Sequence, residues 1–444
     1  MHKDEKLEAI LALVKDYIDE KHSKKTWTAG KDWVQYAGPF FDSNEFVRSV
    51  NTLMHEWLVL GEDSQKFERK FPKLLGKEYG ILTNSGSSSN LIMMSCLKSK
   101  RLYDLPEGTK VITPIAGFPT TINPIIQNGF IPEFVDISLD NLNLDLESVE
   151  RAAKNGAKVL IFAHVLGNPP DMDSLMDIVK KYDLILLEDA CDALGSMYDG
   201  KPLGSFGEMS SCSFYPAHHI TMGEGGFVAT KTYQQEVVAR SFREWGRGCY
   251  CVGKSANLLK DGTCKKRFGK WLPMLPNEVF DHKYVYEEIG YNLKPIELQA
   301  SMGLAQLQKL DTITEKRKEN YARLLSIFQK YEEFFHLPKA TSKSDPSWFA
   351  FPLTLRSNSA FARKDITSFL ESNKIQTRTY FAGNIMLQPA YSHLMDSAKA
   401  MNDFPVATKI TTDTFFLGTS PVITSEQIDY IEHVIRQFMK DQKR

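Results

Sequence analysis

The stretch "SSCSFYPAHHITMGEGGFVAT", residues 210–230, places two short apolar strands on either side of a polar turn. The turn carries His218 and His219, and a Gly-rich segment leads back into the second strand. Upstream, similar runs with many β-branched residues read "KVITP", "IPEFVDI", "KVLIFAHV" and "LILLEDA", and they alternate with helical segments such as "DSLMDIVKKYD". This alternation predicts an α/β fold around a mostly parallel sheet.

The length of 444 residues suits a large α/β domain and a smaller second one. Residues 246–292 interrupt the alternation with many Gly, Cys, Lys and aromatic residues, which indicates an inserted functional loop. A long helical pattern follows Pro295, and strand and helix patterns resume toward the C-terminus. We therefore expect an N-terminal helix and arm (1–40), a large domain (41–314) containing the insert, and a small α/β domain (315–444).

The charge balance argues against two classes of partner. Lys and Arg number 54 and Asp and Glu 55, a formal net charge of −1, which favours neither a nucleic-acid surface nor an anionic membrane. The first 25 residues have an amphipathic helical pattern without the apolar core of a signal peptide, and no run of about 18 apolar residues occurs. We expect a cytoplasmic protein.

Two further motifs follow predicted strands. "TNSGSSSNL", residues 83–91, is a small-residue turn opening a helix, where backbone N–H groups can hold a phosphate. "LILLEDACDALGS" places Asp189 at the end of an apolar run, where a carboxylate could keep a pyridinium nitrogen protonated. Each motif alone is equally compatible with an ordinary helix cap.

Taken in order with "GYNLKP", residues 290–295, these motifs resemble the pyridoxal-phosphate-dependent sugar aminotransferase family, which acts on nucleotide-linked 4-keto sugars. The resemblance covers about residues 40–440 and implies an aspartate-aminotransferase-like structure, the fold type I of these enzymes, with a seven-stranded sheet. It implies a homodimer in which Asn292 reaches the phosphate of the neighbouring subunit. The other implied cofactor contacts are Gly86, Ser87, Ser88 and Ser213 at the phosphate, Phe118 on the ring, Asp189 on its nitrogen, and Asp192.

His218 stands where the resemblance implies the lysine that binds the cofactor covalently. An imidazole can accept and return a proton near pH 7, but it cannot form that bond. The motif resembles the 3-dehydrases of deoxysugar biosynthesis, which implies pyridoxamine 5'-phosphate as cofactor, His218 as the base, and loss of the hydroxyl on carbon 3. The expected substrate is a nucleotide-linked 4-keto-6-deoxyhexose, first of all CDP-4-keto-6-deoxy-D-glucose, in 3,6-dideoxysugar and O-antigen biosynthesis. We expect His219 to be structural or to contact the partner subunit.

Four of the six cysteines distinguish the possible subtypes. Cys191, Cys249, Cys251 and Cys264 resemble the ligands of a [2Fe–2S] cluster, although the last interval is longer than in the family. Such a cluster implies an NADH-dependent flavin and iron–sulfur reductase as partner. A zinc site, unrelated reduced thiols, a metal-free glutamate-coupled 3-dehydrase acting on a GDP-linked sugar, and a catalytically silent cofactor-binding regulator remain alternatives.

Substrate contacts are less clearly marked. Tyr215 in the histidine turn, and Arg378 and Asn384 in "RTYFAGNIMLQP", are candidates by resemblance. Cationic residues in and beside the insert are equally compatible with binding a pyrophosphate, docking a reductase, or a solvated loop; they are Arg243, Arg247, Lys265, Lys266 and Arg267.

Overall fold

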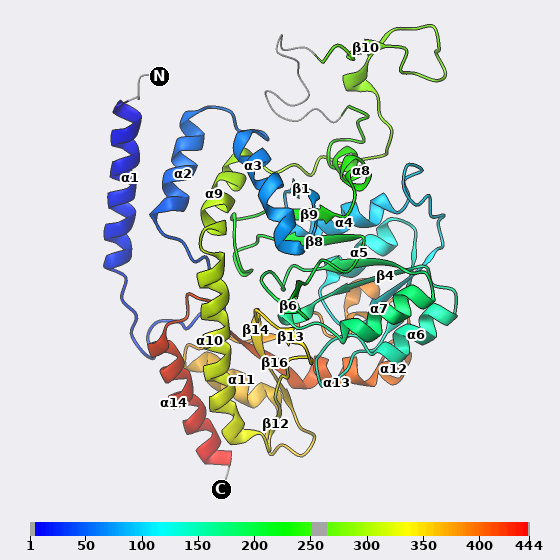
Figure 1. The fold of residues 1–444 in the computed structure, drawn as a ribbon. Coiled ribbons are helices and arrows are strands. Elements are labelled where there is room, and N and C mark those ends of the chain that lie inside the picture. Colours follow the sequence, from blue (N-terminus) through cyan, green and yellow to red (C-terminus); the bar gives the residue numbers. More distant parts are fainter. Residues whose placement is uncertain (1–4, 250–263, 443–444) are drawn as a thin grey trace.

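A seven-stranded sheet forms the centre of the computed structural model, which describes residues 5–249 and 264–442 (Figure 1). Its order is β1-β9-β8-β5-β4-β2-β3. The strands are β1 (Tyr79–Thr83), β2 (Lys110–Pro114), β3 (Ile131–Val135), β4 (Val159–Ala163), β5 (Ile185–Asp189), β8 (Met209–Ser213) and β9 (Gly226–Thr230). β9 runs antiparallel to both of its neighbours, β1 and β8, and the other adjacent strands of this sheet pair parallel. The predicted α/β fold with a mostly parallel seven-stranded sheet is confirmed.

Helices cover both faces of this sheet, and β4 shows why. Val159 and Ile161 pack with the apolar residues of α4 (Gly86–Cys96), α5 (Pro119–Gln127) and α8 (Tyr233–Arg243). Leu160 and Phe162 point to the other face, toward α6 (Leu146–Lys154) and α7 (Met172–Lys181). All four side chains are fully buried, which is why this strand is a continuous apolar run rather than an alternating one.

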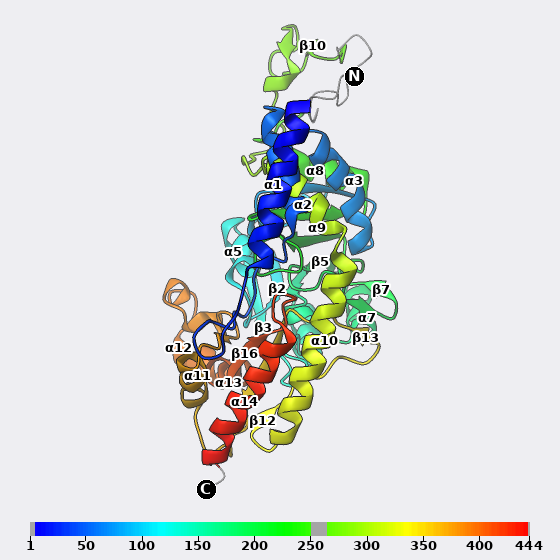
Figure 2. The same cartoon turned by 90° about the vertical axis from the view of Figure 1, so that its left-hand side faces the viewer.

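The N-terminal part packs along one side of the large domain. Its helices are α1 (Glu5–Ser23), α2 (Ser43–Met54) and α3 (Glu62–Lys70), and α1 lies alongside α2 (Figure 2). The helical pattern after Pro295 forms two helices, α9 (Glu297–Leu307) and α10 (Leu310–Phe328). The Glu297 carboxylate accepts the N–H groups of Gly61 and Asp63, both at 2.6 Å, and so joins the start of α3 to α9.

The small domain is an antiparallel sheet covered by helices. Its strands are β12 (Phe335–His336), β14 (Ala350–Leu355), β16 (Thr414–Gly418) and β15 (Arg378–Thr379), in that order. Its helices are α11 (Arg363–Ser372), α12 (Ser397–Asp403), α13 (Pro405–Asp413) and α14 (Ser425–Gln442). The arm after α1 joins this domain through a bridge of Val34 to Ile375 and the packing of the Trp27 ring on Tyr430.

The described part of the insert projects from the large domain above α8 (Figure 1). It contains two short paired strands, β10 (Phe268–Gly269) and β11 (Phe280–Asp281), as expected for an irregular segment. Cys251 lies outside the described residues. The helices of the described residues include none that combines the length and apolar character required to span a membrane.

Candidate active site

A cavity of about 1010 Å³ lies where the strand ends β5 and β8 and the start of α4 face the small domain. Most of the predicted site residues line it: Gly86, Ser87, Phe118, Asp189, Cys191, Asp192, Ser213, Tyr215, His218 and Arg378. Residues absent from the prediction close it, among them Tyr36, Asn90, Phe349, Phe381 and Tyr391. The carboxyl ends of parallel strands are the usual place for ligands in such sheets.

The N-terminus of α4 forms one end of the cavity. Ser85 caps the helix by accepting the N–H of Ser88 at 3.1 Å, and its hydroxyl lies 3.0 Å from that of Ser88. The Ser88 side chain therefore serves the cap and does not line the cavity. At Gly86 a Cβ atom would lie 2.5 Å from the Cβ of Ser213 and 3.0 Å from the sulfur of Cys191. Only glycine allows this approach, which leaves a helix N-terminus open to an anion such as phosphate.

Asp189 lies deep in the cavity and is oriented by neutral donors. Its Oδ2 accepts hydrogen bonds from the amide of Asn90 and the hydroxyl of Thr121, both at 2.7 Å, and its Oδ1 accepts the N–H of Cys191 at 3.1 Å. Asn90 is fixed in turn by the hydroxyl of Ser211 at 2.6 Å. Sequence reasoning missed Asn90 and Thr121; the polar Asn90 within the buried helix α4 was the available signal.

His218 presents its imidazole to the same cavity. Its Nδ1 lies 3.4 Å from Oδ1 of Asp192, and its ring lies 5.3 Å from that of Phe349. Burial lowers the pKa of His218 to about 4, and burial together with the nearby Asp189 raises the pKa of Asp192 to about 7. The imidazole is therefore neutral at pH 7, the form that can accept a proton.

The neighbouring His219 points elsewhere. Its Nε2 donates to the carbonyl of Ser347 at 2.7 Å, and the side chain is buried. It therefore ties the turn to the small domain, in agreement with the structural role expected for it.

The predicted substrate contacts divide into two groups. Tyr215 is half exposed at the cavity, and the Arg378 guanidinium lies 4.3 Å above the Tyr36 ring. Asn384, in contrast, is fully buried outside the cavity, where its amide donates to the carbonyl of Ala400 at 3.1 Å. Its side chain packs the small domain, so we no longer count it among the substrate contacts.

The DegT/DnrJ/EryC1/StrS aminotransferase family model matches residues 41–436. The chain belongs to this family. The match confirms the resemblance drawn from the ordered motifs.

Two relatives are similar to this chain in sequence, and one solved structure is similar to it in fold. The lipopolysaccharide biosynthesis protein RfbH of Salmonella typhimurium is 42% identical over 433 residues, covering 97% of each chain. The dTDP-4-dehydro-2,6-dideoxy-D-glucose 3-dehydratase of Saccharopolyspora spinosa is 39% identical over 433 residues, covering 97% of this chain and 91% of the relative. A GDP-4-keto-6-deoxymannose-3-dehydratase structure with a trapped PLP-glutamate geminal diamine matches with a TM-score of 0.77 and 27% identity, covering 90% of this chain and 99% of that one.

Three of the predicted positions that the structure describes lie in or at the edge of the insert: Asn292, Cys249 and Cys264. Asn292 is exposed and lies outside the cavity, where its side-chain oxygen accepts a hydrogen bond from Lys294 at 2.8 Å. Its predicted contact with a neighbouring subunit stays a prediction. Cys249 and Cys264 are half-buried. Across residues 5–249 and 264–442, no three His, Cys, Asp or Glu side chains form a group that could hold a metal ion.

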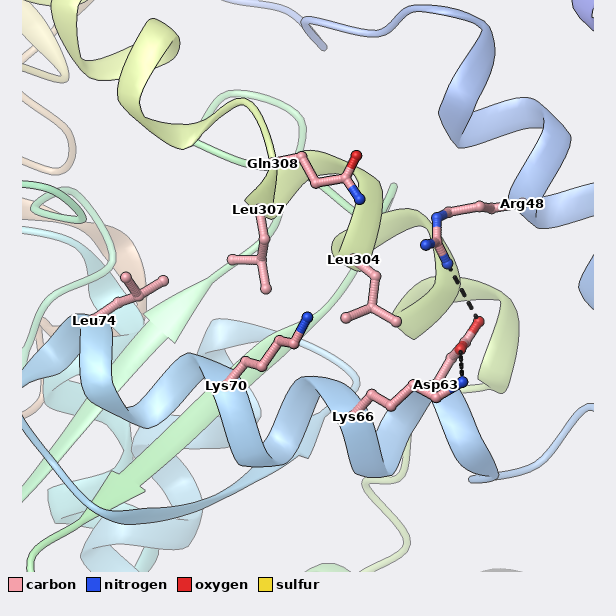
Figure 3. Close-up of a pocket in the computed structure, with 8 residues that line it drawn as sticks. All are labelled: Arg48, Asp63, Lys66, Lys70, Leu74, Leu304, Leu307 and Gln308. Atoms are coloured by element: carbon pink, nitrogen blue, oxygen red, sulfur yellow. Dashed lines mark hydrogen bonds and ion pairs between the residues drawn. The ribbon is translucent and has the colours of Figure 1, made fainter.

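A second cavity of about 340 Å³ lies between α3 and α9 (Figure 3). It is lined by Arg48, Asp63, Lys66, Lys70, Leu74, Leu304, Leu307 and Gln308. Its single carboxylate, Asp63, is 3.4 Å from Lys66 and 4.0 Å from Arg48. Its lining residues include no histidine for proton transfer, in contrast to the first cavity, which contains His218.

Proposed function

We propose that the chain is a pyridoxamine-phosphate-dependent 3-dehydrase of a nucleotide-linked 4-keto-6-deoxyhexose. The observation that carries this proposal is the buried imidazole of His218 in the same cavity as Asp189, at the position where the family resemblance implies a lysine. A family member without that lysine has no side chain there to hold the cofactor covalently. The dTDP-sugar relative and the solved structure, both 3-dehydratases, support the same reaction class.

The residues around the cavity fit the cofactor. The start of α4 with Gly86 and Ser87, together with Ser213, would hold the phosphate, and Asp189 would meet the ring nitrogen. Phe118, half exposed at the cavity, would stack on the ring. When bound, pyridoxamine phosphate supplies an amine that condenses with a keto carbon and a ring that accepts electrons.

The chain's own contribution is to hold and move a proton. Neutral His218 can accept a proton at the cavity side of its ring, and Asp192, 3.4 Å from Nδ1, orients the imidazole and is close enough to share the charge that results. The aromatic rings of Phe349, Phe381 and Tyr391 cover the small-domain side, where they limit access of water.

The electron source is a separate part of the proposal. We assign a [2Fe–2S] cluster to Cys191, Cys249, Cys251 and Cys264, fed by an NADH-dependent flavin and iron–sulfur reductase. Cys191 supports this because it lines the cavity one residue from Asp192. The described cysteines do not themselves form a three-ligand group, and Cys251 lies outside the described residues.

The glutamate-coupled alternative has a specific observation in its favour. The solved 3-dehydratase structure contains a trapped PLP-glutamate geminal diamine, and its fold matches this chain with a TM-score of 0.77. Iron and acid-labile sulfide analysis of anaerobically purified protein separates the two versions. Metal-free protein that turns over with glutamate would replace the cluster in the proposal, whereas bound iron and sulfide with dependence on a reductase would support it.

The substrate and its setting complete the proposal. We name CDP-4-keto-6-deoxy-D-glucose first, in O-antigen synthesis by a cytoplasmic homodimer; the name of the Salmonella relative supports the polysaccharide pathway. Since relatives are named for dTDP-linked and GDP-linked sugars, the nucleotide must be tested directly.

The deciding experiment incubates protein loaded with pyridoxamine phosphate with CDP-, dTDP- and GDP-linked 4-keto-6-deoxyhexoses, and follows loss of the carbon 3 hydroxyl by mass spectrometry. His218→Lys should abolish this loss. His219→Gln is the matched control, because glutamine can still donate to the Ser347 carbonyl. Cofactor binding without loss of the hydroxyl from any sugar would leave only a silent regulator, and parental turnover by His218→Lys would exclude His218 as the base.

A further inference from the structure

A buried arginine lies beneath the histidine turn. Arg317 of α10 is 1% exposed, and its guanidinium hydrogen bonds to the described residues all go to backbone carbonyls. Nη2 donates to the carbonyls of Ala217 and His218, both at 3.2 Å. Nη1 donates to the carbonyls of Phe349 at 3.0 Å and Trp348 at 3.5 Å. Together with the His219 imidazole on the Ser347 carbonyl, this side chain therefore joins the turn that carries His218 to the segment whose ring lies against that imidazole.

The Trp348–Phe349 segment and the turn that carries His218 differ in the hydrogen bonds that hold their backbones apart from those of Arg317. The Phe349 N–H donates to the carbonyl of Leu166 at 2.9 Å, and the Trp348 carbonyl also accepts the hydroxyl of Thr419 at 2.6 Å. The backbone of His218 has one further contact, its N–H donating to the carbonyl of Tyr215 at 3.0 Å within the turn itself. The neighbouring His219 and Thr221 also fix the turn, through the Ser347 carbonyl and the Gln306 side chain, but Arg317 is the side chain that holds the His218 backbone itself to a segment already held by two other parts of the fold.

The charge of Arg317 is costly to bury, which argues against a role in packing alone. Burial lowers its pKa to about 10, so the side chain stays charged at pH 7. Among the described residues, no ion pair joins it to a carboxylate. The groups that face His218 from the surrounding elements are Asp189 and Asp192 with the Cys191 backbone after β5, and Arg317 from α10. A neutral side chain would fill the space, but only a guanidinium has the forked donors that reach both segments.

We propose that Arg317 is a positioning residue for His218: it fixes the imidazole between Asp192 and the Phe349 ring by clamping the histidine turn to the Trp348–Phe349 segment. This inference rests on the proposed function of His218 in proton transfer. Arg317 itself does not line the cavity and touches no reacting atom.

The test compares Arg317→Met, Arg317→Lys and the control Arg323→Met. Arg323 lies on the same helix but is partly exposed, and it pairs with Asp429 at 2.6 Å. Three quantities are measured on cofactor-loaded protein: kcat and KM for dehydration, the Kd of pyridoxamine phosphate, and the ¹⁵N-histidine NMR signals of the His218 ring, assigned by their loss in His218→Asn. A displacement of the base by about 1 Å can cost about a hundredfold in rate.

We expect Arg317→Met to lower kcat by at least about tenfold, with KM and the cofactor Kd within about threefold of the parent. The His218 ring signals should shift in this variant and stay unchanged in Arg323→Met, and Arg317→Lys should recover part of kcat. Parental kcat in Arg317→Met, or a loss of kcat that follows the loss of folded, cofactor-binding protein, would overturn the proposal.

If Arg317→Met does not fold, Arg317→Lys decides: reduced kcat with unchanged cofactor binding supports positioning, and parental kcat overturns it. If the parent dehydrates no sugar, the proposed function has failed, and the His218 ring signals alone judge the clamp. Unchanged signals in Arg317→Met or Arg317→Lys would then refute it.

Discussion

Gly86 offers the sharpest test of where the cofactor phosphate binds. In Gly86→Ala the new Cβ would be 2.5 Å from the Cβ of Ser213 and 3.0 Å from both the Ser213 hydroxyl and the Cys191 sulfur. The start of α4 and the end of β8 would have to separate by about 1 Å to restore ordinary van der Waals contact. That movement would pull apart the two elements that we expect to hold the phosphate.

The magnitude follows from two opposing effects. Overpacking of a well-packed site costs about 1–3 kcal/mol. Replacing glycine by alanine restricts the unfolded chain and regains about 0.4–1 kcal/mol. Both effects change the free energy of unfolding, but only the strain can change cofactor binding, and about 1–2 kcal/mol of strain borne by the phosphate site would reduce the cofactor affinity by about 5- to 30-fold.

The assay is a titration of cofactor-free protein with pyridoxal phosphate and pyridoxamine phosphate, followed by absorbance, together with thermal unfolding. Gly38→Ala is the control, because its Cβ would find its nearest neighbours at an ordinary 3.6 Å. An affinity of Gly86→Ala within twofold of the parent would refute the assignment of the phosphate to this helix start.

Three other expectations concern neighbouring parts of the structure. Thr121→Val removes a 2.7 Å donor from Asp189 without changing the shape of the side chain, and titration should show a cofactor affinity weakened by about 1 kcal/mol; unchanged affinity would contradict a role for this contact. Asn384→Ala should lower the free energy of unfolding by about 1–3 kcal/mol in urea while leaving KM for the sugar nucleotide unaltered, and an increased KM would restore Asn384 as a substrate contact. Burial alone would raise the pKa of Glu68, but the charges of Arg240 and Arg243 outweigh burial and lower this pKa. The ion pairs of Glu68 with the two arginines therefore stabilise the fold at pH values above the unfolded-state pKa near 4.3. This stability is lost as the pH falls through the lower pKa of the folded state. Glu68→Gln should therefore cost about 3–5 kcal/mol at pH 7 and reduce the acid dependence of unfolding, whereas an unchanged dependence would show that other groups cause it.

Local sequence patterns predicted the strands but could not predict their order. The runs that became β4 and β5 are apolar on both faces, which identifies central strands of a parallel sheet. Their neighbours in the sheet depend on contacts between residues far apart in the chain, and no local pattern encodes these. For example, β1 pairs with β9, whose residues lie more than a hundred positions later.

The part of the candidate site in the large domain was predictable, because its residues lie at strand ends and turns that can be recognised in the sequence. Gly86, Asp189 and His218 each stand at a strand end or in a turn, and although the motifs around Gly86 and Asp189 alone also fit a helix cap, the order of the motifs along the chain carries the family resemblance. The small-domain half was not, because Phe349 and Tyr391 are ordinary aromatic residues until the fold brings them to the cavity. Asn384 shows the opposite limit: a motif gives its place along the chain, but packing decides that its amide faces Ala400 instead of the cavity.

Under the proposed function, the presence of His218 in place of a lysine changes how the rest of the site must hold the cofactor. Without a covalent bond, the cofactor must be retained by non-covalent contacts alone, from the start of α4, Ser213 and Asp189. Each such contact contributes about 1–3 kcal/mol when one partner is charged. The three oriented donors around Asp189 and the close approach at Gly86 then become the main determinants of cofactor affinity. Because no covalent bond helps to hold the cofactor, we expect its affinity to be more sensitive to small changes at the phosphate end of this site than in a site with the lysine.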